Sequence, residues 1–475
     1  MERLSYDELL EVVIQLRRVV AEQARVIEEQ ARQLAQRDRR IAELERRAAE
    51  LERSGKRQAA PFSKGEPKAD PKPPGRKPGS QYGRQATRPV PPRVDETIVV
   101  GCPLFCRRCG GTVRLVGKAS QYVVDLPPIR PKTTEFVVHY GCCRSCGGRV
   151  QGRHAQQMSQ ALGVGAVQIG AGVLALAAYL NKVGGLSYEK IAGLLKQMLG
   201  LTVARATLCR ALKRLARKAE ATYDGLIGRI RGSPVVYPDE TGWKVGGQRA
   251  WLWAFTNRQQ TVYTIEAGRG YGEAASVLGE DYAGVIGADG WAPYRLFEHA
   301  RLQTCLAHLQ RRCREMLETA TRGAVRFPRA VKALLSTALS VRDRRDAGTL
   351  SVHGLSVARG RLRSRLERLL AARLTHPDNR RLAKHLRRYR QALFLFLERP
   401  DVEATNWPAE HAIRSAVVTR KTCGGNRTRS GATTQATLMS ILRTCHQQHR
   451  NPINVFVRML RASSPQPYRP LIEAR

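Results

Sequence analysis

Carboxylates stand at three places in this basic chain where strand or helix patterns could bring them together. Asp239 and Glu240 end an apolar run in YPDETGW, Asp289 follows the apolar run AGVIGA, and Glu410 lies in ATNWPAEHAIRSAVV. Two-metal phosphodiester chemistry needs carboxylate oxygens that hold two magnesium ions about 4 Å apart. Each acid alone would be an ordinary turn or surface residue, but together they predict such a metal site.

Asp239 is the better metal ligand of the adjacent pair in YPDETGW. Side chains alternate along a strand, so Asp239 shares a side with Val235 and Tyr237, while Glu240 points the opposite way. We therefore expect Asp239, and not Glu240, in the cleft.

Strands and one helix must position these acids. The runs VVYPD, RAWLWAFTN and QTVYTIEAG, joined by KVGGQ and NRQ turns, predict a three-stranded meander. A short helix in GYGEAASVLG then leads to a buried strand that delivers Asp289 at its carboxyl end, where functional side chains of α/β sheets collect. Asn406 can cap a helix with Pro408 in its first turn, and Asn406, Glu410 and Arg414 then share one face.

Four of the eleven cysteines have the spacing of a zinc site. Cys106 and Cys109 form one C-x-x-C pair and Cys143 and Cys146 another, so two tight glycine-containing knuckles could present four thiolates tetrahedrally. This zinc would be structural, because four thiolates leave no position for a substrate. A β-rich span with QYVVDLPP and TTEFVVHY separates the pairs. Buried thiols without metal are the alternative, and two nearby residues could substitute as ligands: Cys102 and Cys142.

The charge of the chain indicates a polyanionic partner. Lys and Arg total 81 against 40 Asp and Glu over 475 residues, a formal net charge of +41. Nucleic acid is the leading partner, and an acidic membrane surface is the rival. The N-terminus MERLSYDELL lacks the pattern of an export signal, which favours the cytosol. The apolar segment 161–180 reaches spanning length but is mostly Ala, Gly and Val, which favours a helix packed inside a domain over a membrane span.

Two segments of different character precede the cysteines. Residues 6–51 follow a heptad with β-branched residues at one seam position, which predicts a parallel two-stranded coiled coil; a single amphipathic helix on the protein surface is the alternative. Residues 56–93 hold ten Lys or Arg, two acids and nine prolines, so they predict an extended linker. Within it, Arg76 and Lys77 in GRKPG could enter the minor groove of DNA or make contacts with phosphates that are independent of sequence.

A helical pair follows the cysteines. SYEKIAGLLKQMLG and TVARATLCRALKRLARKA predict two helices broken at Gly200. The second could be a recognition helix of the helix-turn-helix kind, although an ordinary helical hairpin fits the same pattern. Its expected DNA-binding residues are Arg205, Arg210 and Lys213, with Thr207 beside them.

DETGW, the ADGW strand, CLAHLQRR at 305–312 and the N-x-x-x-E-x-x-x-R helix resemble DDE transposases of the insertion-sequence-66 family. The resemblance covers nearly the whole chain, including the heptads, the PGRKPG linker and the C-x-x-C pairs. It implies an RNase H-like catalytic fold in which Asp239, Asp289 and Glu410 hold Mg²⁺ or Mn²⁺, interrupted by a helical insertion. The chain departs from the family pattern at His411, where arginine is usual, and at GGNRTRSGA. We interpret the C-x-x-H pair Cys305 and His308 as structural, since two ligands do not make a metal site.

The resemblance implies that the chain binds the ends of its own mobile element, cleaves DNA there and joins the ends to target DNA. The expected partners are therefore DNA, at least one further copy of the chain, and accessory proteins of the same element, in the bacterial cytoplasm at the nucleoid and without a membrane. A non-catalytic, zinc-containing DNA-binding regulator is the alternative, and a structural nucleoid protein is a third possibility. Arg414, Arg420 and Lys421 are further expected DNA contacts.

The fold class that follows is multidomain. The expected parts are a coiled coil at 1–54, a basic linker at 55–94, a zinc ribbon at 95–155, a helical helix-turn-helix-like region at 156–232, an α/β RNase H-like domain at 233–310 and 401–450, a basic helical insertion at 311–400 and a C-terminal tail at 451–475.

Overall fold

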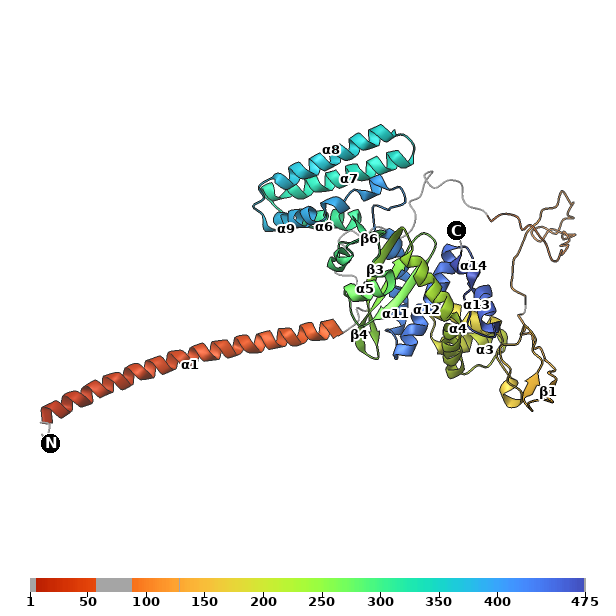
Figure 1. Ribbon diagram of the computed structural model, residues 1–475, viewed down its shortest axis with the longest axis horizontal. Coiled ribbons are helices and arrows are strands. Elements are labelled where there is room, and N and C mark those ends of the chain that lie inside the picture. The colour runs from red at the N-terminus through yellow and green to blue at the C-terminus, as the bar shows by residue number, and fades with distance from the viewer. Residues whose placement is uncertain (1–5, 57–87, 128, 474–475) are drawn as a thin grey trace. The chain divides into compact units, whose positions relative to one another are not determined.

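The computed structural model describes residues 6–56, 88–127 and 129–473. The chain divides into two units, Met1–Pro71 and Lys72–Arg475. In the first, helix α1 runs without interruption over Tyr6–Lys56 (Figure 1). Its seam residues Leu16, Ile27 and Leu34 are each more than half exposed. The heptads are therefore helical, and their pairing into a coiled coil stays a prediction. Arg76 and Lys77 lie outside the described residues.

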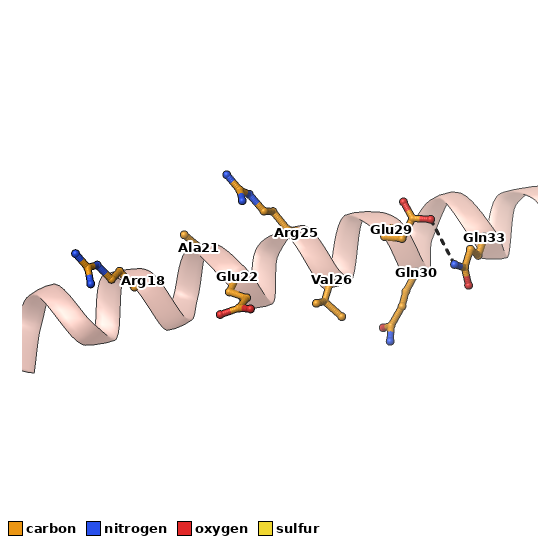
Figure 2. A pocket seen from close by; sticks show the side chains of 8 residues that line it. All are labelled: Arg18, Ala21, Glu22, Arg25, Val26, Glu29, Gln30 and Gln33. Carbon is orange, nitrogen blue, oxygen red and sulfur yellow. Dashed lines mark hydrogen bonds between the residues drawn. The ribbon is translucent and has the colours of Figure 1, made fainter.

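A shallow hollow runs along one stretch of α1 (Figure 2). Its eight lining residues lie between Arg18 and Gln33, and all belong to this helix. Within it, Gln33 donates a hydrogen bond to Glu29 at 3.4 Å. The hollow is the space between side chains of one exposed helix, so it is not a binding site.

The cysteine region contains little regular structure. Strands β1 (Tyr140–Cys142) and β2 (Arg149–Gln151) pair antiparallel around the second C-x-x-C, and an isolated bridge between Phe105 and Thr112 encloses the first. The β-rich interpretation of the span between the pairs was wrong for its described residues, which form no strand up to β1. Its valines are mostly exposed, including Val116, Val123 and Val124. A segment that neither pairs with a neighbouring strand nor covers a hydrophobic core gains too little free energy to form a regular strand.

Three helices precede the sheet: α2 (Ala171–Lys182), α3 (Tyr188–Leu199) and α4 (Arg205–Arg231). The break at Gly200 is confirmed, because this residue ends α3 in the left-handed conformation. The apolar segment 161–180 is only partly helical. The alanines of α2 pack into the main core, which is the hydrophobic cluster shared by α2, α3, α4 and one face of the sheet. No helix among the described residues combines the length and apolar character that crossing a membrane requires.

A five-stranded mixed sheet follows, in the order β5-β4-β3-β6-β7. Strands β3 (Val235–Val245), β4 (Gln248–Thr256) and β5 (Thr261–Glu266) form the meander that the sequence predicts. After helix α5 (Tyr271–Leu278), β6 (Val285–Ala288) and β7 (Arg301–Thr304) run parallel to β3. The carboxyl ends of β3 and β6 therefore point to the same edge of the sheet.

The segment 311–400, expected as an insertion, is helical, and its first helix begins five residues earlier, at Leu306. It comprises α6 (Leu306–Thr319), α7 (Arg326–Asp346), α8 (Val352–Ala371), α9 (Pro377–Arg388) and α10 (Leu395–Glu398). Figure 1 shows α7 and α8 side by side. These helices form their own hydrophobic cluster, which Val235, Tyr237 and Val285 of the sheet join. The insertion is thus packed against the strands that carry Asp239 and Asp289.

Two long helices complete the sheet domain. Helix α11 (Trp407–Cys423) packs on β3 and β4, and α12 (Arg429–Gln447) packs on β5 and α4. Ala412, Ile413 and Ala416 of α11 share a third hydrophobic cluster with Leu252 and Ala254 of β4. The small buried residues of α11 allow its backbone to lie close to the sheet, which brings Glu410 near β3.

Residues 451–475 were expected to form a tail, but most of them fold. Helix α13 (Pro452–Arg461) and the short α14 (Arg469–Ile472) bury Phe456, Met459 and Leu471 in the main core beside α2 and α4. The apolar residues of PINVFVRML recur at helical spacing, a pattern that the sequence interpretation overlooked. This same core joins α2 to α4 with one face of the sheet, so one cluster crosses the expected boundary at residue 232.

Candidate metal centre

The strand register sets which acid of YPDETGW faces α11. In the β3–β4 ladder, Asp239 lies opposite Ala254 and Glu240 opposite Trp253. Directly opposed residues share a sheet face, and Ala254 belongs to the cluster with α11 while Trp253 belongs to the main core. Asp239 therefore lies on the α11 face and Glu240 on the other, as the alternation predicts.

The surroundings of Asp239 raise its pKa. Its Oδ1 accepts a hydrogen bond from the Glu240 N–H at 2.9 Å. Burial first, and then the carboxylates of Glu240, Asp289 and Glu410, together raise the pKa of Asp239 to about 7 against that one hydrogen bond. Like charges at short range disfavour ionisation. Asp289 and Glu410 are thus each close enough to Asp239 to disfavour its ionisation.

Asp289 follows β6 in a turn that the insertion holds. The Trp291 N–H donates to Asp289 Oδ1 at 3.0 Å. Gly290 has φ of 94°, and a Cβ there would lie 3.2 Å from the His385 ring. The Tyr389 hydroxyl donates to the Gly290 carbonyl at 2.7 Å. Only glycine adopts this conformation without strain, so the turn and the contacts from the end of α9 fix Asp289 together.

Glu410 lies in the first turn of α11, but Asn406 does not cap that helix with its side chain. Asn406 is the N-cap residue, as expected, but the expected side-chain cap bond is absent, and Asn406 Nδ2 donates to the Pro238 carbonyl at 2.9 Å. This bond ties the start of α11 to β3 at the residue before Asp239. It positions Glu410 relative to Asp239 directly, which a helix cap would not do.

Glu240 forms a buried ion pair beside the acids. Its side chain is 3% exposed and contacts Arg269, whose Nε donates to Oε1 at 2.6 Å. The Arg269 guanidinium lies over the rings of Trp251 and Trp291, at 4.9 and 4.1 Å from their centroids. Cation–π contacts of this kind favour a fixed guanidinium. Arg269 therefore compensates part of the Glu240 charge, although burial still raises the pKa of Glu240 above its ordinary value.

One group of potential ligands was missed from the sequence. Cys305, His308 and Glu410 offer ligand atoms that all lie within 4.8 Å of one another. Among the described residues, no other set of three or more His, Cys, Asp or Glu side chains meets that spacing. The C-x-x-H spacing showed Cys305 and His308 in the sequence. The third residue, Glu410, lies on α11 after the insertion, so no spacing along the chain indicated that it joins them.

The acids fit a divalent cation by the chemistry of their donors. Asp239, Asp289 and Glu410 supply carboxylate oxygens, the ligands that Mg²⁺ prefers, and their mutual repulsion is what a cation would relieve. Their oxygens are not all within 4.8 Å of one another. Two ions about 4 Å apart need a wider spread of ligands than one ion does, so this spacing is compatible with a two-metal site.

The two cysteine knuckles have the same local structure. The Cys106 N–H donates to the Gly111 carbonyl at 2.8 Å, and the Cys143 N–H donates to the Gly148 carbonyl at 2.8 Å. Backbone N–H groups, chiefly those of Arg108 and Cys146, lower the pKa of the Cys106 and Cys143 thiols respectively. Such groups stabilise thiolates, the form that binds zinc. The four thiols are not grouped within the 4.8 Å that defines a ligand cluster.

The cations expected to bind DNA fall into two classes. Arg205 and Arg210 are exposed near the start of α4, whereas Lys213 is half-buried. Arg205 also lies 3.6 Å from Glu189 in α3. In α11, two cations are exposed: Arg414 and Lys421. Arg420 differs from them, because its Nη1 donates to Thr241 Oγ1 at 2.9 Å and also to the Gly242 carbonyl, so it joins α11 to β3.

Comparison with known proteins identifies the family of this chain. Residues 166–434 match the model of the Transposase IS66 family. The uncharacterized protein y4qI of Sinorhizobium fredii is 25% identical in an alignment 293 positions long, which covers 54% of this chain and 52% of the relative. The uncharacterized protein y4jO of the same organism is 29% identical over 161 residues, 34% of this chain and 47% of the relative. The chain spans about half the length of these curated relatives. Because the family match covers more than half of its residues, the chain belongs to the IS66 transposase family.

Proposed function

We propose that this protein is a DDE transposase that binds the ends of its insertion sequence and catalyses metal-dependent cleavage and transfer of DNA strands. The observation that carries the proposal is that Asp289, in the turn after β6, and Glu410, on α11, lie near enough to Asp239 on β3 to raise its pKa. The sheet order, with a three-stranded meander and two parallel strands, is compatible with an RNase H-like fold. Family membership supports the same role.

In this proposal, Asp239, Asp289 and Glu410 would hold Mg²⁺ or Mn²⁺. When bound, two such ions activate the attacking oxygen and stabilise the leaving oxygen of a phosphodiester. The protein's own contribution is positioning. Tyr389 and Gly290 fix the turn of Asp289, and the bond from Asn406 to Pro238 sets the start of α11 against β3. Such fixed supports are what hold catalytic groups in productive geometry.

The phosphate backbone of DNA would be bound by the cationic surface. The chain carries a formal net charge of +41. Exposed Arg205 and Arg210 on α4 and Arg414 and Lys421 on α11 would contribute, and Arg414 lies one helical turn from Glu410. Phosphate contacts give affinity and register without reading sequence, so these cations would place a strand near the acids.

Zinc at the knuckles and assembly through α1 complete the proposal. Cys106, Cys109, Cys143 and Cys146 would share one zinc ion that draws the two knuckles together and gives the region a core it otherwise lacks. The exposed α1 seam would pair with a second copy, which would bring two element ends together on the bacterial nucleoid. Accessory proteins of the same element would join this assembly.

A non-catalytic DNA-binding regulator is the second candidate, because the knuckles and the α3–α4 pair would serve it equally well. The two functions separate in one experiment. Full-length protein is incubated with DNA that carries the element end, with and without Mg²⁺, and strand breaks are counted. A transposase cuts only with Mg²⁺, and the Asp289→Asn variant does not cut, whereas the control Asp281→Asn, at an exposed acid on the loop before β6, does. Binding without any cutting under all conditions would favour the regulator.

A further inference from the structure

We propose that Cys305, His308 and Glu410 form a separate binding site for a thiophilic transition-metal ion such as Zn²⁺, placed so that it shares Glu410 with the proposed magnesium ligands. Cys305 directly precedes α6 and is 1% exposed. His308 lies in the first turn of α6, and Glu410 lies in the first turn of α11. Their ligand atoms lie within 4.8 Å of one another.

The donor set selects the class of metal. A thiolate, an imidazole and a carboxylate are ligands of zinc and related ions, whereas Mg²⁺ takes oxygen ligands almost exclusively. Three protein ligands leave one position of a tetrahedral ion for water or another group. This site therefore differs in chemistry from the Asp239 and Asp289 pair beside it, and it also differs from the four-thiolate knuckles.

The distance between His308 and Glu410 favours a bridging ion over a hydrogen bond. His308 Nδ1 lies 3.7 Å from Glu410 Oε1, which is too long for a hydrogen bond, and this buried nitrogen has no other hydrogen-bond partner among the described residues. Zinc bonds to nitrogen and oxygen of about 2.0–2.1 Å at the tetrahedral angle separate two ligand atoms by roughly 3.4 Å. The pair is therefore already near the spacing that an ion imposes.

Asn406 supports the site from outside. Its N–H donates to Cys305 Sγ at 3.2 Å, the kind of contact that stabilises a thiolate ligand. The Asn406 side chain is 2% exposed, and its Oδ1 has no hydrogen-bond partner among the described residues. Asn406 also holds the start of α11 against β3. A change at Cys305 would therefore alter the position of the helix start that carries Glu410.

The consequence for catalysis rests on the proposed function. An ion bound by Cys305, His308 and Glu410 would occupy a carboxylate oxygen that the magnesium site needs. Zinc would therefore compete with Mg²⁺ for Glu410 and inhibit strand cutting, and removal of zinc would restore cutting.

Cobalt binding tests the site without DNA or catalysis. Reduced, metal-free full-length protein is titrated with Co²⁺, whose thiolate charge-transfer absorption reports cysteine ligands. We expect wild type and the control Cys423→Ser, at an exposed cysteine outside the site, to bind one more Co²⁺ per chain than Cys305→Ser and His308→Gln. Circular dichroism checks folding, and His308→Gln carries the test if Cys305→Ser does not fold. Equal stoichiometry and equal spectra in all four proteins would overturn the proposal.

The link to Glu410 has its own readout. If Mg²⁺-dependent cutting occurs, we expect Zn²⁺ in slight excess to lower it at least tenfold in wild type, and to lower it far less in His308→Gln relative to that variant's own rate. Equal inhibition of the two proteins would refute the sharing of Glu410. If no cutting is found but the extra Co²⁺ binds, the proposed function fails and the transition-metal site stands.

Discussion

Asp239→Asn should make the metal-free protein more stable at pH 8, although it removes a proposed catalytic group. The pKa of Asp239 is raised from its ordinary value of 3.8 to about 7, first by burial and then by the neighbouring carboxylates. A raised pKa means that the folded state prefers the protonated form. Stability is therefore greatest below about pH 4 with respect to this group, and it falls as pH rises to about 7, because the unfolded chain ionises first. Asparagine cannot ionise and avoids this cost.

The size of the effect follows from the pKa. A pKa about three units above its value in the unfolded chain corresponds to about 4 kcal/mol of lost stability above pH 7. The protein relaxes around a buried charge, so we expect about 2 to 4 kcal/mol. Such a gain should raise Tm by roughly 4 to 8 °C. At pH 5 the expected gain is less than half as large, because the folded carboxyl is still protonated there.

The assay is thermal unfolding of wild type and Asp239→Asn in magnesium-free buffer at pH 5 and pH 8, followed by circular dichroism. Glu240→Gln is the matched control, with the same loss of charge one residue later. It removes the ionic partner of Arg269, whose side chain is 32% exposed, so we expect it to stabilise the protein less than Asp239→Asn does at pH 8. Millimolar Mg²⁺ should raise the Tm of wild type more than that of Asp239→Asn. If Asp239→Asn gains nothing at pH 8, or gains equally at both pH values, the pKa of Asp239 is not raised by burial and the neighbouring carboxylates.

Three further predictions concern the other parts of the chain. Purified full-length protein should contain zinc, and Cys106→Ser together with Cys143→Ser should lose one equivalent by elemental analysis; an unchanged zinc content would rule out the knuckles as ligands. Light scattering should show at least a dimer for the full chain and a smaller species for a truncation that begins at residue 56, whereas equal masses would mean that α1 does not mediate assembly. Gly290→Ala should cost about 1 to 3 kcal/mol and impair Mg²⁺-dependent cutting, because φ is 94° and the new Cβ would lie 3.2 Å from His385; wild-type stability and cutting would show that the turn is not under constraint.

Local patterns in the sequence were sufficient to predict four of the five strands of the main sheet, and β7 (Arg301–Thr304) was not predicted. Alternation along VVYPDETGW placed Asp239 and Glu240 on opposite faces, and the β3–β4 register has this arrangement. The apolar run before Asp289 identified β6. These predictions succeed because a strand's side-chain period and a buried strand's composition depend only on neighbouring residues. The role of the three acids as a catalytic triad stays a prediction.

Contacts between distant segments could not be predicted from the sequence. Asn406 has the residue type and position of a helix cap, but the approach of β3 offers its side chain the Pro238 carbonyl instead. In the sequence, Arg420 resembles a free DNA-binding cation. In the structure it donates hydrogen bonds to Thr241 and Gly242 of β3. Likewise, His308 and Glu410 are about a hundred residues apart in the sequence, and the tertiary fold brings α6 and α11 together. Each of these depends on tertiary structure that overrides local preference.

The most direct test of the central claim separates DNA cutting from DNA binding at the three acids. Asp239→Asn, Asp289→Asn and Glu410→Gln each remove one negative charge from the proposed metal ligands and leave the surrounding cations in place. Mg²⁺-dependent nicking of labelled element-end DNA is measured beside binding of the same DNA at matched salt. The proposal predicts that each variant loses nicking and binds as tightly as wild type or slightly more tightly. Nicking at the wild-type rate by all three variants would contradict it.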